Sequence, residues 1–233
     1  MIESFKLPFN FNISQVQTEL NDFHDAKWLP HFNTGYYSGN WSGLSLRSPG
    51  GNSNSLYPVS DKEYSDTDLM STFPSVKKIT EYFECNILSV RFLRLEKGGI
   101  IKEHFDNALS YEDGEVRLHI PIQTNSGVEF TSNGKSLLMN EGECWYINAG
   151  LPHSAANNGE TDRIHLVIDC VVNDWIKSFF PEIAAENKGM ASIKTEKDLR
   201  EMIAALRNMG TPVALKMAEE LMGKDEGGRM KDE

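Results

Sequence analysis

The stretch from residue 87 to residue 172 constrains the fold most, because short apolar, β-branched runs alternate there with turn residues. The runs recur at intervals of roughly 8–15 residues, and Gly or Asn stands in the turns between them. The clearest runs are ILSVRFLRL, IIKEHFD, VRLHIPIQT and RIHLVIDCVV. This spacing predicts an antiparallel sandwich or barrel.

Helical patterns stand on both sides of this β-rich centre. Residues 14–26 carry apolar side chains at helical spacing, and residues 67–84 are expected to form a second helix. The chain has helical composition again after Asn173. We therefore predict a mainly β domain over residues 1–180 with N-terminal helices, followed by a C-terminal helical extension over residues 181–233.

The charge of the chain narrows the choice of partners. The 233 residues carry a formal net charge of −11, and 39% of them are hydrophobic, which is enough for a core. Proteins that bind nucleic acid or anionic membranes usually present an excess of lysine and arginine. We therefore expect a small-molecule partner, with no nucleic acid and no membrane. The oligomeric state stays open.

The cysteines and the N-terminus predict a cytoplasmic location. No stretch approaches the roughly 18 consecutive apolar residues of a membrane span. The start, MIESFKLPFNFNIS, lacks the basic residues and apolar centre of a signal peptide. Cys85, Cys144 and Cys170 lie far apart, so neither a zinc site nor a disulfide framework is expected.

The segment EHFDN, residues 103–107, places a histidine and an aspartate two positions apart at the end of an expected strand. Side chains alternate across a strand with a period of two, so His104 and Asp106 point to the same side if the segment is extended. Phe105 is then expected to point into the core behind them. His153 follows the expected strand and turn GECWYINAG and is the natural third member of the set.

Two histidines and one carboxylate form the facial triad of non-haem iron(II) oxygenases. Such a triad leaves coordination positions open for O2 and for a bidentate oxo acid. An isolated H-x-D pattern occurs by chance in many proteins, and an isolated histidine such as His153 is more often a hydrogen-bonded loop residue. The assignment of His104, Asp106 and His153 as Fe(II) ligands therefore depends on the residues around them.

Arg163 strengthens this assignment, because it lies ten residues after His153 at the start of the expected strand RIHLVIDC. A guanidinium group binds a carboxylate through two parallel hydrogen bonds. That geometry suits the distal carboxylate of 2-oxoglutarate, which would make Arg163 a co-substrate-binding residue. Without such a partner, Arg163 would be an exposed charge at a strand end.

The run VRLHIPI supplies a further polar pair. Arg117 and His119 share one face of the expected strand, and apolar residues share the other. Polar residues on one face of so apolar a strand line a cavity or, alternatively, form the solvated side of the sheet. The same alternation recurs at Arg163 and His165, where His165 is the weaker candidate.

A small zwitterionic substrate would require a cation for its carboxylate, and three arginines are candidates. Arg91 and Arg94 stand in SVRFLRL, and Arg47 stands in an upstream run. Arg91 and Arg94 have opposite parity, so at most one of them faces a cavity in a regular strand. Three aromatic residues could form an apolar wall, although ordinary core packing is the simpler reading for them: Trp41, Trp145 and Tyr146.

Taken in order, the motifs GNWSGLSLRSPGG, LSVRFLRLEKGGIIKEH, EHFDN, VRLHIPIQTN, GECWYINAGLPHSAANN and DRIHLVIDC resemble one family. It is the aspartyl/asparaginyl β-hydroxylase family of Fe(II)- and 2-oxoglutarate-dependent oxygenases. Within it, the chain is most similar to bacterial enzymes that hydroxylate free L-proline in the cis configuration. The resemblance covers roughly residues 35–172. Some animal members lack the metal-binding carboxylate, whereas Asp106 is present here.

The resemblance implies a double-stranded β-helix, which is a jelly roll of the cupin-like kind. It implies His104, Asp106 and His153 as Fe(II) ligands and Arg163 on the distal carboxylate of 2-oxoglutarate. It places Arg117 and His119 near the co-substrate in some members.

The activity that the resemblance implies is hydroxylation of an unactivated carbon in a small, proline-like amino acid. O2 and 2-oxoglutarate would be consumed, and succinate and CO2 would be released. Three alternatives remain open. The chain could hydroxylate Asp or Asn side chains in a peptide or carrier-bound substrate, it could be a cupin dioxygenase that does not use 2-oxoglutarate, or it could be a non-catalytic cupin-like metal-binding protein.

Overall fold

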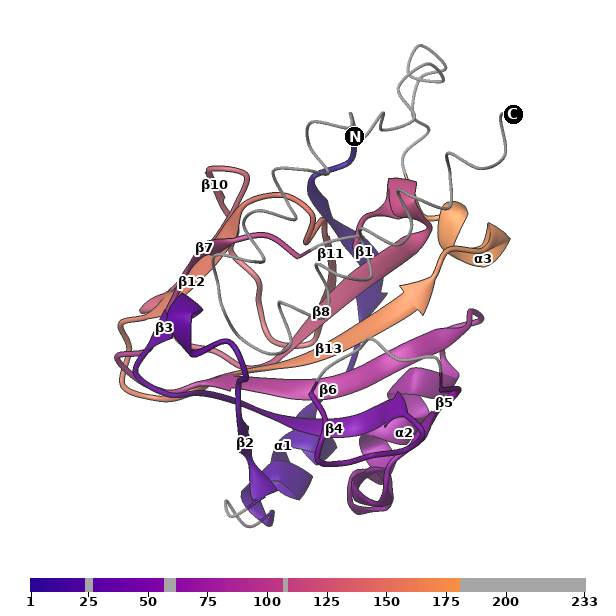
Figure 1. Ribbon diagram of the computed structural model, residues 1–233, viewed down its shortest axis with the longest axis horizontal. Coiled ribbons are helices and arrows are strands. Elements are labelled where there is room, and N and C mark those ends of the chain that lie inside the picture. Colours follow the sequence, from indigo (N-terminus) through magenta and orange to yellow (C-terminus); the bar gives the residue numbers. More distant parts are fainter. Residues whose placement is uncertain (24–26, 57–61, 107–108, 181–233) are drawn as a thin grey trace, which may run out of the picture. The chain divides into compact units, whose positions relative to one another are not determined.

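The computed structural model describes residues 1–23, 27–56, 62–106 and 109–180 (Figure 1). These residues belong to one compact unit, Met1–Pro181. The expected C-terminal helical extension over residues 181–233 lies outside the described residues. In the described part, no helix is long and apolar enough to cross a membrane.

The N-terminal half combines short strands with short helices. Its elements are β1 (Ser4–Asn10), α1 (Ser14–Asn21), β2 (Leu29–Pro30), η2 (Thr34–Tyr36), β3 (Tyr37–Ser38), β4 (Trp41–Pro49), β5 (Tyr64–Asp66), η3 (Asp68–Thr72) and α2 (Pro74–Glu81). The remainder is almost entirely β. It contains β6 (Ile87–Leu95), β7 (Ile100–His104), η4 (Tyr111–Asp113), β8 (Glu115–Gln123), β9 (Val128–Ser132), β10 (Lys135–Ser136), β11 (Glu143–Ile147), β12 (His153–Asn157), β13 (Arg163–Val171) and α3 (Asp174–Lys177).

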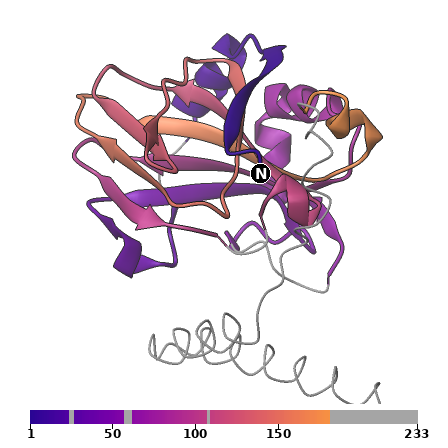
Figure 2. The ribbon, with the colours of Figure 1, turned by 90° about the horizontal axis from the view of Figure 1, so that it is seen from above.

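Within the described residues the strands form two antiparallel sheets, which Figures 1 and 2 show from two directions. The major sheet has the order β1-β11-β8-β13-β6-β4-β2, and β5 pairs with β4. The minor sheet has the order β10-β9-β12-β7-β3. Consecutive strands pass between the sheets, as from β6 to β7 and from β12 to β13. The predicted jelly roll is confirmed.

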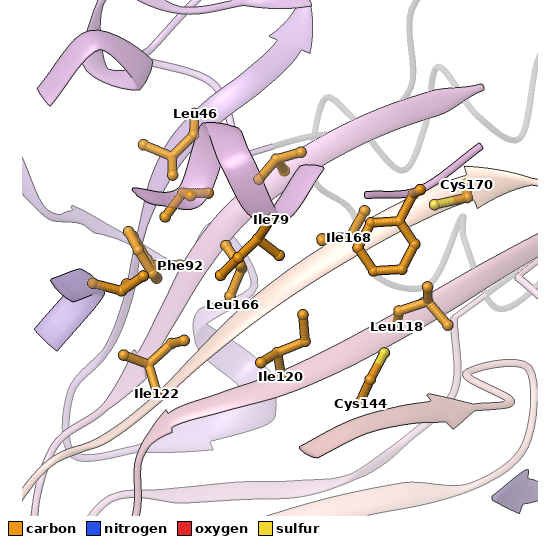
Figure 3. Packing of buried hydrophobic residues seen from close by; sticks show 14 of the residues in the cluster. Leu46, Ile79, Phe92, Leu118, Ile120, Ile122, Cys144, Leu166, Ile168 and Cys170 are labelled. Carbon is orange, nitrogen blue, oxygen red and sulfur yellow. The ribbon is translucent and has the colours of Figure 1, made fainter. Parts of the chain in front are cut away.

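The outer face of the major sheet packs against α1 and α2 (Figure 3). Leu118 and Ile120 of β8 and Leu166 and Ile168 of β13 are fully buried there. Ile79 of α2 packs into the same cluster. Complete burial of such a side chain contributes roughly 1.5–3 kcal/mol. This side of the sheet therefore fixes the central strands rigidly.

The inner face of the major sheet is different, because the alternate residues of the same strands are polar. A smaller apolar cluster between the sheets includes Leu93, Phe130 and Val167. Arg117 and His119 point to this side of β8, opposite Leu118. Side chains that are polar yet buried therefore gather between the two sheets.

Two features of the N-terminal half were absent from the sequence analysis. β1 forms an edge of the major sheet, with Ser4 opposite Ile147 of β11. The second expected helix is divided into η3 and α2, and Pro74 occupies the first turn of α2. Proline is favoured there because the first helical N–H groups have no acceptor within the helix.

Candidate active site

His104 and His153 lie directly opposite each other on neighbouring strands of the minor sheet. His104 is the last residue of β7, His153 is the first of β12, and the two are paired in register. Their ring centroids are 4.3 Å apart. The fold thus brings together two histidines separated by almost fifty residues of sequence.

Each of these histidines uses one ring nitrogen within the fold. Nδ1 of His104 donates to the carbonyl of Lys102 at 2.8 Å, and Nδ1 of His153 donates to the carbonyl of Leu151 at 2.9 Å. A carbonyl oxygen only accepts, so the proton is assigned to Nδ1 and the lone pair to Nε2. This arrangement orients a histidine as a metal ligand. Burial also lowers the pKa of His153 to about 4, which keeps its ring neutral.

Asp106 follows the end of β7, and its backbone N–H donates to the carbonyl of Ala149 at 2.7 Å. Its carboxylate forms an ion pair with Arg117 through Oδ2. Burial opposes ionisation, but the charge and hydrogen bond of Arg117 outweigh it and lower the pKa of Asp106. The carboxylate of Asp106 is therefore ionised.

No three His, Cys, Asp or Glu side chains in the described ranges are already arranged to hold a metal ion. The two histidines face each other, whereas the aspartate is paired with an arginine. The expectation for Phe105 is wrong: this side chain is 60% exposed. Because β7 ends at His104, the alternation of a strand does not extend to the next residue.

A buried ionic network continues from Arg117 into the major sheet. Arg117 Nε donates to Asp169 Oδ1 at 2.8 Å, and Nη2 donates to Oδ2 at 3.1 Å. Arg91 Nη1 lies 3.0 Å from Asp169 Oδ2, which also accepts from Ser89 Oγ at 2.8 Å. The network links the inner faces of β6, β8 and β13 to Asp106.

Arg163 is almost completely buried, with 3% of its surface exposed, on the inner face of β13. Its Nε has no hydrogen-bond partner, and its Nη2 lies 3.1 Å from Nδ1 of His165. The guanidinium also lies over the ring of Phe130, 5.6 Å from the centroid. Burial lowers the pKa of Arg163 to about 10. A buried cation without a carboxylate partner suits an anionic ligand.

His119 and His165 lie beside Arg163 and are also buried. Their Nδ1 atoms are 3.4 Å apart. Burial, reinforced by the positive charge of Arg163, lowers the pKa of both rings well below the usual value. Both are therefore neutral, so they provide hydrogen-bonding groups without adding positive charge.

Two of the three candidate substrate arginines lie elsewhere. Arg94 lies over the ring of Trp28 at 4.3 Å, on the side of β6 opposite Arg91, where a cleft of about 320 Å³ opens. Arg47 donates to Asp66, to the carbonyl of Tyr64 and to the carbonyl of Ile87 at the junction of β4 and β5. Only Arg91 joins the inner network.

Of the three aromatic candidates, one lies close to the histidines. Trp41 belongs to the cluster between the sheets, with its ring centroid 6.1 Å from that of His104. Trp145 is half-buried, and its Nε1 donates to Glu143. Tyr146 lies in the outer core, which is the ordinary core packing that the sequence favoured for it.

Three site residues were missed by the sequence analysis. Asp169 has the same strand parity as Arg163, so the alternation could have revealed it. Ser132 is paired in register with His153, and its buried hydroxyl has no hydrogen-bond partner. Nε1 of Trp41 is likewise buried without a partner. His31 stacks on Trp41 with ring centroids 3.5 Å apart, and burial lowers its pKa to about 3. It precedes β3 in a loop, where no periodic pattern marks it.

Comparison with known proteins identifies the family of the chain. The aspartyl/asparaginyl β-hydroxylase family matches the chain over residues 10–172. L-proline cis-4-hydroxylase from Rhizobium meliloti (strain 1021) is 30% identical over 139 residues, which are 59% of this chain and 49% of that protein. The chain therefore spans about half the length of this curated relative.

A solved structure supports the fold. An oxidoreductase of the 2OG-Fe(II) oxygenase family from Burkholderia pseudomallei superposes with a TM-score of 0.50 at 13% identity. The superposition covers 72% of this chain and 85% of the other. The resemblance first noted in the motifs is thus confirmed over most of the sequence: the chain belongs to the aspartyl/asparaginyl β-hydroxylase family.

Proposed function

We propose that the chain is an Fe(II)- and 2-oxoglutarate-dependent dioxygenase that hydroxylates a small, proline-like amino acid. The observation that carries this proposal is the pairing of His104 and His153, whose Nδ1 atoms are held by backbone carbonyls so that the Nε2 lone pairs are available to a metal. His104, His153 and Asp106 would hold the iron. The ion pair with Arg117 uses Oδ2 of Asp106, and a carboxylate has a second oxygen for a metal.

Arg163 is proposed to bind the distal carboxylate of 2-oxoglutarate. Its buried Nε lacks a partner, and the neutral His119 and His165 add no competing charge beside it. When bound, iron(II) with O2 and 2-oxoglutarate would supply the oxidation that inserts one oxygen atom into a carbon–hydrogen bond, with release of succinate and CO2. The protein's part is to position the reactants and to exclude water.

The charge of the site supports a substrate that carries a carboxylate. Arg91, Arg117 and Arg163 bring three positive charges between the sheets, and Asp106 and Asp169 bring two negative charges. The charges of an Fe(II) ion and a 2-oxoglutarate dianion cancel. One positive charge is left over, and Arg91 is the group proposed to present it to a substrate carboxylate. The similarity to L-proline cis-4-hydroxylase points to a proline-like substrate.

A coupled assay tests the proposal. The purified protein is incubated with Fe(II), ascorbate, 2-oxoglutarate and single candidates from a panel of free amino acids, beginning with L-proline. We expect succinate to rise with one amino acid, together with product that has gained one oxygen atom. Asp106→Ala should abolish both signals, whereas Asp66→Asn, which alters an ion pair outside the site, should retain them.

The same assay separates the alternatives. Turnover only with peptides that contain Asp or Asn would replace the amino-acid substrate by a polypeptide side chain, as the description of the matching family suggests. Oxygen uptake that does not require 2-oxoglutarate would indicate a cupin dioxygenase. Binding of metal without turnover of any candidate would leave a metal-binding protein. Full activity of Asp106→Ala would overturn the assignment of the iron ligands.

A further inference from the structure

Asp169 is the most heavily hydrogen-bonded acidic group between the sheets. Only 2% of its surface is exposed. Its Oδ1 accepts from Nε of Arg117, and its Oδ2 accepts from Nη2 of Arg117 and from Ser89. Arg91 adds an ion pair to Oδ2. Four donors on one carboxylate leave it little capacity for a ligand of its own.

The position of Asp169 is set by the major sheet. It lies on β13, paired in register with Ser89 on β6 and with Arg117 on β8. Burial opposes its ionisation, but Arg117 and Arg91 outweigh burial and hold its pKa below the usual range. A buried ion pair of this kind adds little to stability relative to apolar residues of similar volume. Its presence at the centre of the sheet therefore suggests a role in the site.

The contacts of Arg117 reveal that role. One edge of its guanidinium, Nε and Nη2, is bound by Asp169, and the remaining Nη1 reaches Asp106. Because a guanidinium group is planar and rigid, fixing one edge fixes the direction of the other. Asp169 thus determines where Arg117 presents its donor to the candidate metal-binding carboxylate. On the other side, it holds Nη1 of Arg91.

We propose that Asp169 is a positioning residue for both halves of the reaction site. Through Arg117 it orients Asp106 toward the metal, and through Arg91 it orients the cation that receives the substrate carboxylate. Asp169 touches neither ligand itself. The inference rests on the proposed function, since it concerns the same metal and the same substrate.

Metal binding without turnover tests the first half. Mn(II) is titrated into the metal-free full-length protein, and free Mn(II) is followed by electron paramagnetic resonance. Loss of an outer group that orients a ligand typically weakens a metal site about 10- to 100-fold, and we expect Asp169→Asn to do so. Asp66→Asn is the matched control, because it also removes the charge of an Arg–Asp pair, that of Arg47. It should bind Mn(II) like the wild type.

A double-mutant cycle distinguishes positioning from a general loss of structure. If Asp169 acts through Arg117, adding Asp169→Asn to Arg117→Met should weaken Mn(II) binding no further. Independent, additive losses would overturn the proposal. The role of Asp169 in positioning Arg91 is tested by kinetics: Asp169→Asn should raise the KM for the amino acid about 10-fold or more. In an Arg91→Met background, adding Asp169→Asn should raise this KM no further.

The possible failures are distinguishable. A wild-type protein that binds no Mn(II) overturns both the proposed function and this inference. Equal Mn(II) affinity of the wild type and Asp169→Asn overturns the inference alone. If Asp169→Asn does not fold, Ser89→Ala removes one of the four donors and leaves the carboxylate in place. It should weaken Mn(II) binding in the same direction by a smaller factor, and unchanged binding would contradict the proposal.

Discussion

Arg163 is the one arginine in the described ranges with a fully buried side-chain nitrogen, Nε, that lacks a hydrogen-bond partner. Arg117 and Arg91 share the carboxylate of Asp169, and Arg47 is paired with Asp66. Desolvating a guanidinium without a carboxylate is unfavourable, so the fold retains it at a cost that a bound anion would offset. At the level of single residues, this imbalance is the clearest sign of a co-substrate.

Arg163→Ala should therefore raise the KM for 2-oxoglutarate. Hydrogen bonds to charged groups contribute roughly 1.5–3 kcal/mol each, so losing them predicts an increase of about 10- to 100-fold or more. Initial rates of succinate formation over a range of 2-oxoglutarate concentrations measure it. Arg47→Ala serves as the control and should leave this KM unchanged. An unaltered KM in Arg163→Ala would remove the residue from the co-substrate site.

At the scale of elements, the alternation of β8 and β13 carried most of what the sequence could predict. It placed Arg117, His119 and Arg163 on the inner face, and the structure buries all three there. The rule failed at Phe105, because it applies only while the chain remains in a strand. The prediction of a site at His104, Asp106 and His153 rests on the two-residue spacing within EHFDN and on the resemblance of the motifs to the family.

β1 could not be predicted in the same way, since its partner, β11, lies more than a hundred residues further along the chain. Its sequence, SFKLPFN, includes Pro8, which is tolerated on an edge strand because it cannot donate to a neighbour. The position of His31 could not be predicted for a related reason. Its place beside Trp41 follows from how a loop folds back on the sheet, which no local pattern encodes.

The turn before β11 allows a stability test of the β1 edge. Gly142 has φ +81°, and a Cβ there would collide with the carbonyl oxygen of Phe11. Gly134 has a similar φ of +73°, with nothing within 4 Å of an added Cβ. Gly134→Ala should cost about 1–2 kcal/mol of unfolding free energy through its backbone conformation alone. Gly142→Ala should cost clearly more, because the clash is added.

Urea denaturation of the two variants beside the wild type measures both losses. The comparison is matched, because the substitution and the sign of φ are the same at the two positions. Equal losses would mean that the contact between Gly142 and the segment after β1 yields without a penalty, and that this edge of the sheet is loosely held.

On the scale of the whole molecule, burying neutral histidines between the sheets makes folding depend on pH. His119 and His165 are almost fully buried, and burial together with Arg163 lowers the pKa of both well below 6.5 in the folded protein. In the unfolded chain, a histidine has a pKa of about 6.5. Below that pH the unfolded state binds protons that the folded state does not, so the free energy of unfolding must fall.

The pH range in which stability is lost separates the contribution of the histidines from that of the acidic groups. Burial lowers the pKa values of His31 and His153 as well, so each of the four histidines adds a slope that approaches about 1.4 kcal/mol per pH unit as the pH falls below about 6.5. The lowered pKa of Asp169 has the same sign, but its contribution is lost only as the pH falls below the ordinary aspartate value of about 3.9. Stability lost between pH 6.5 and pH 4.5 therefore reports mainly on buried histidine.

Urea midpoints of the metal-free protein, measured between pH 7.5 and pH 4.5, test this prediction. His119→Gln should reduce the slope by about 1.4 kcal/mol per pH unit at the acidic end, whatever it does to stability at pH 7.5. A substitution at an exposed position that forms no ion pair within the described part of the chain, Lys78→Gln, should leave the slope unchanged. If the wild-type curve is flat across this range, His119 and His165 take up protons freely in the folded state, and the closed, neutral environment around Arg163 is not maintained in solution.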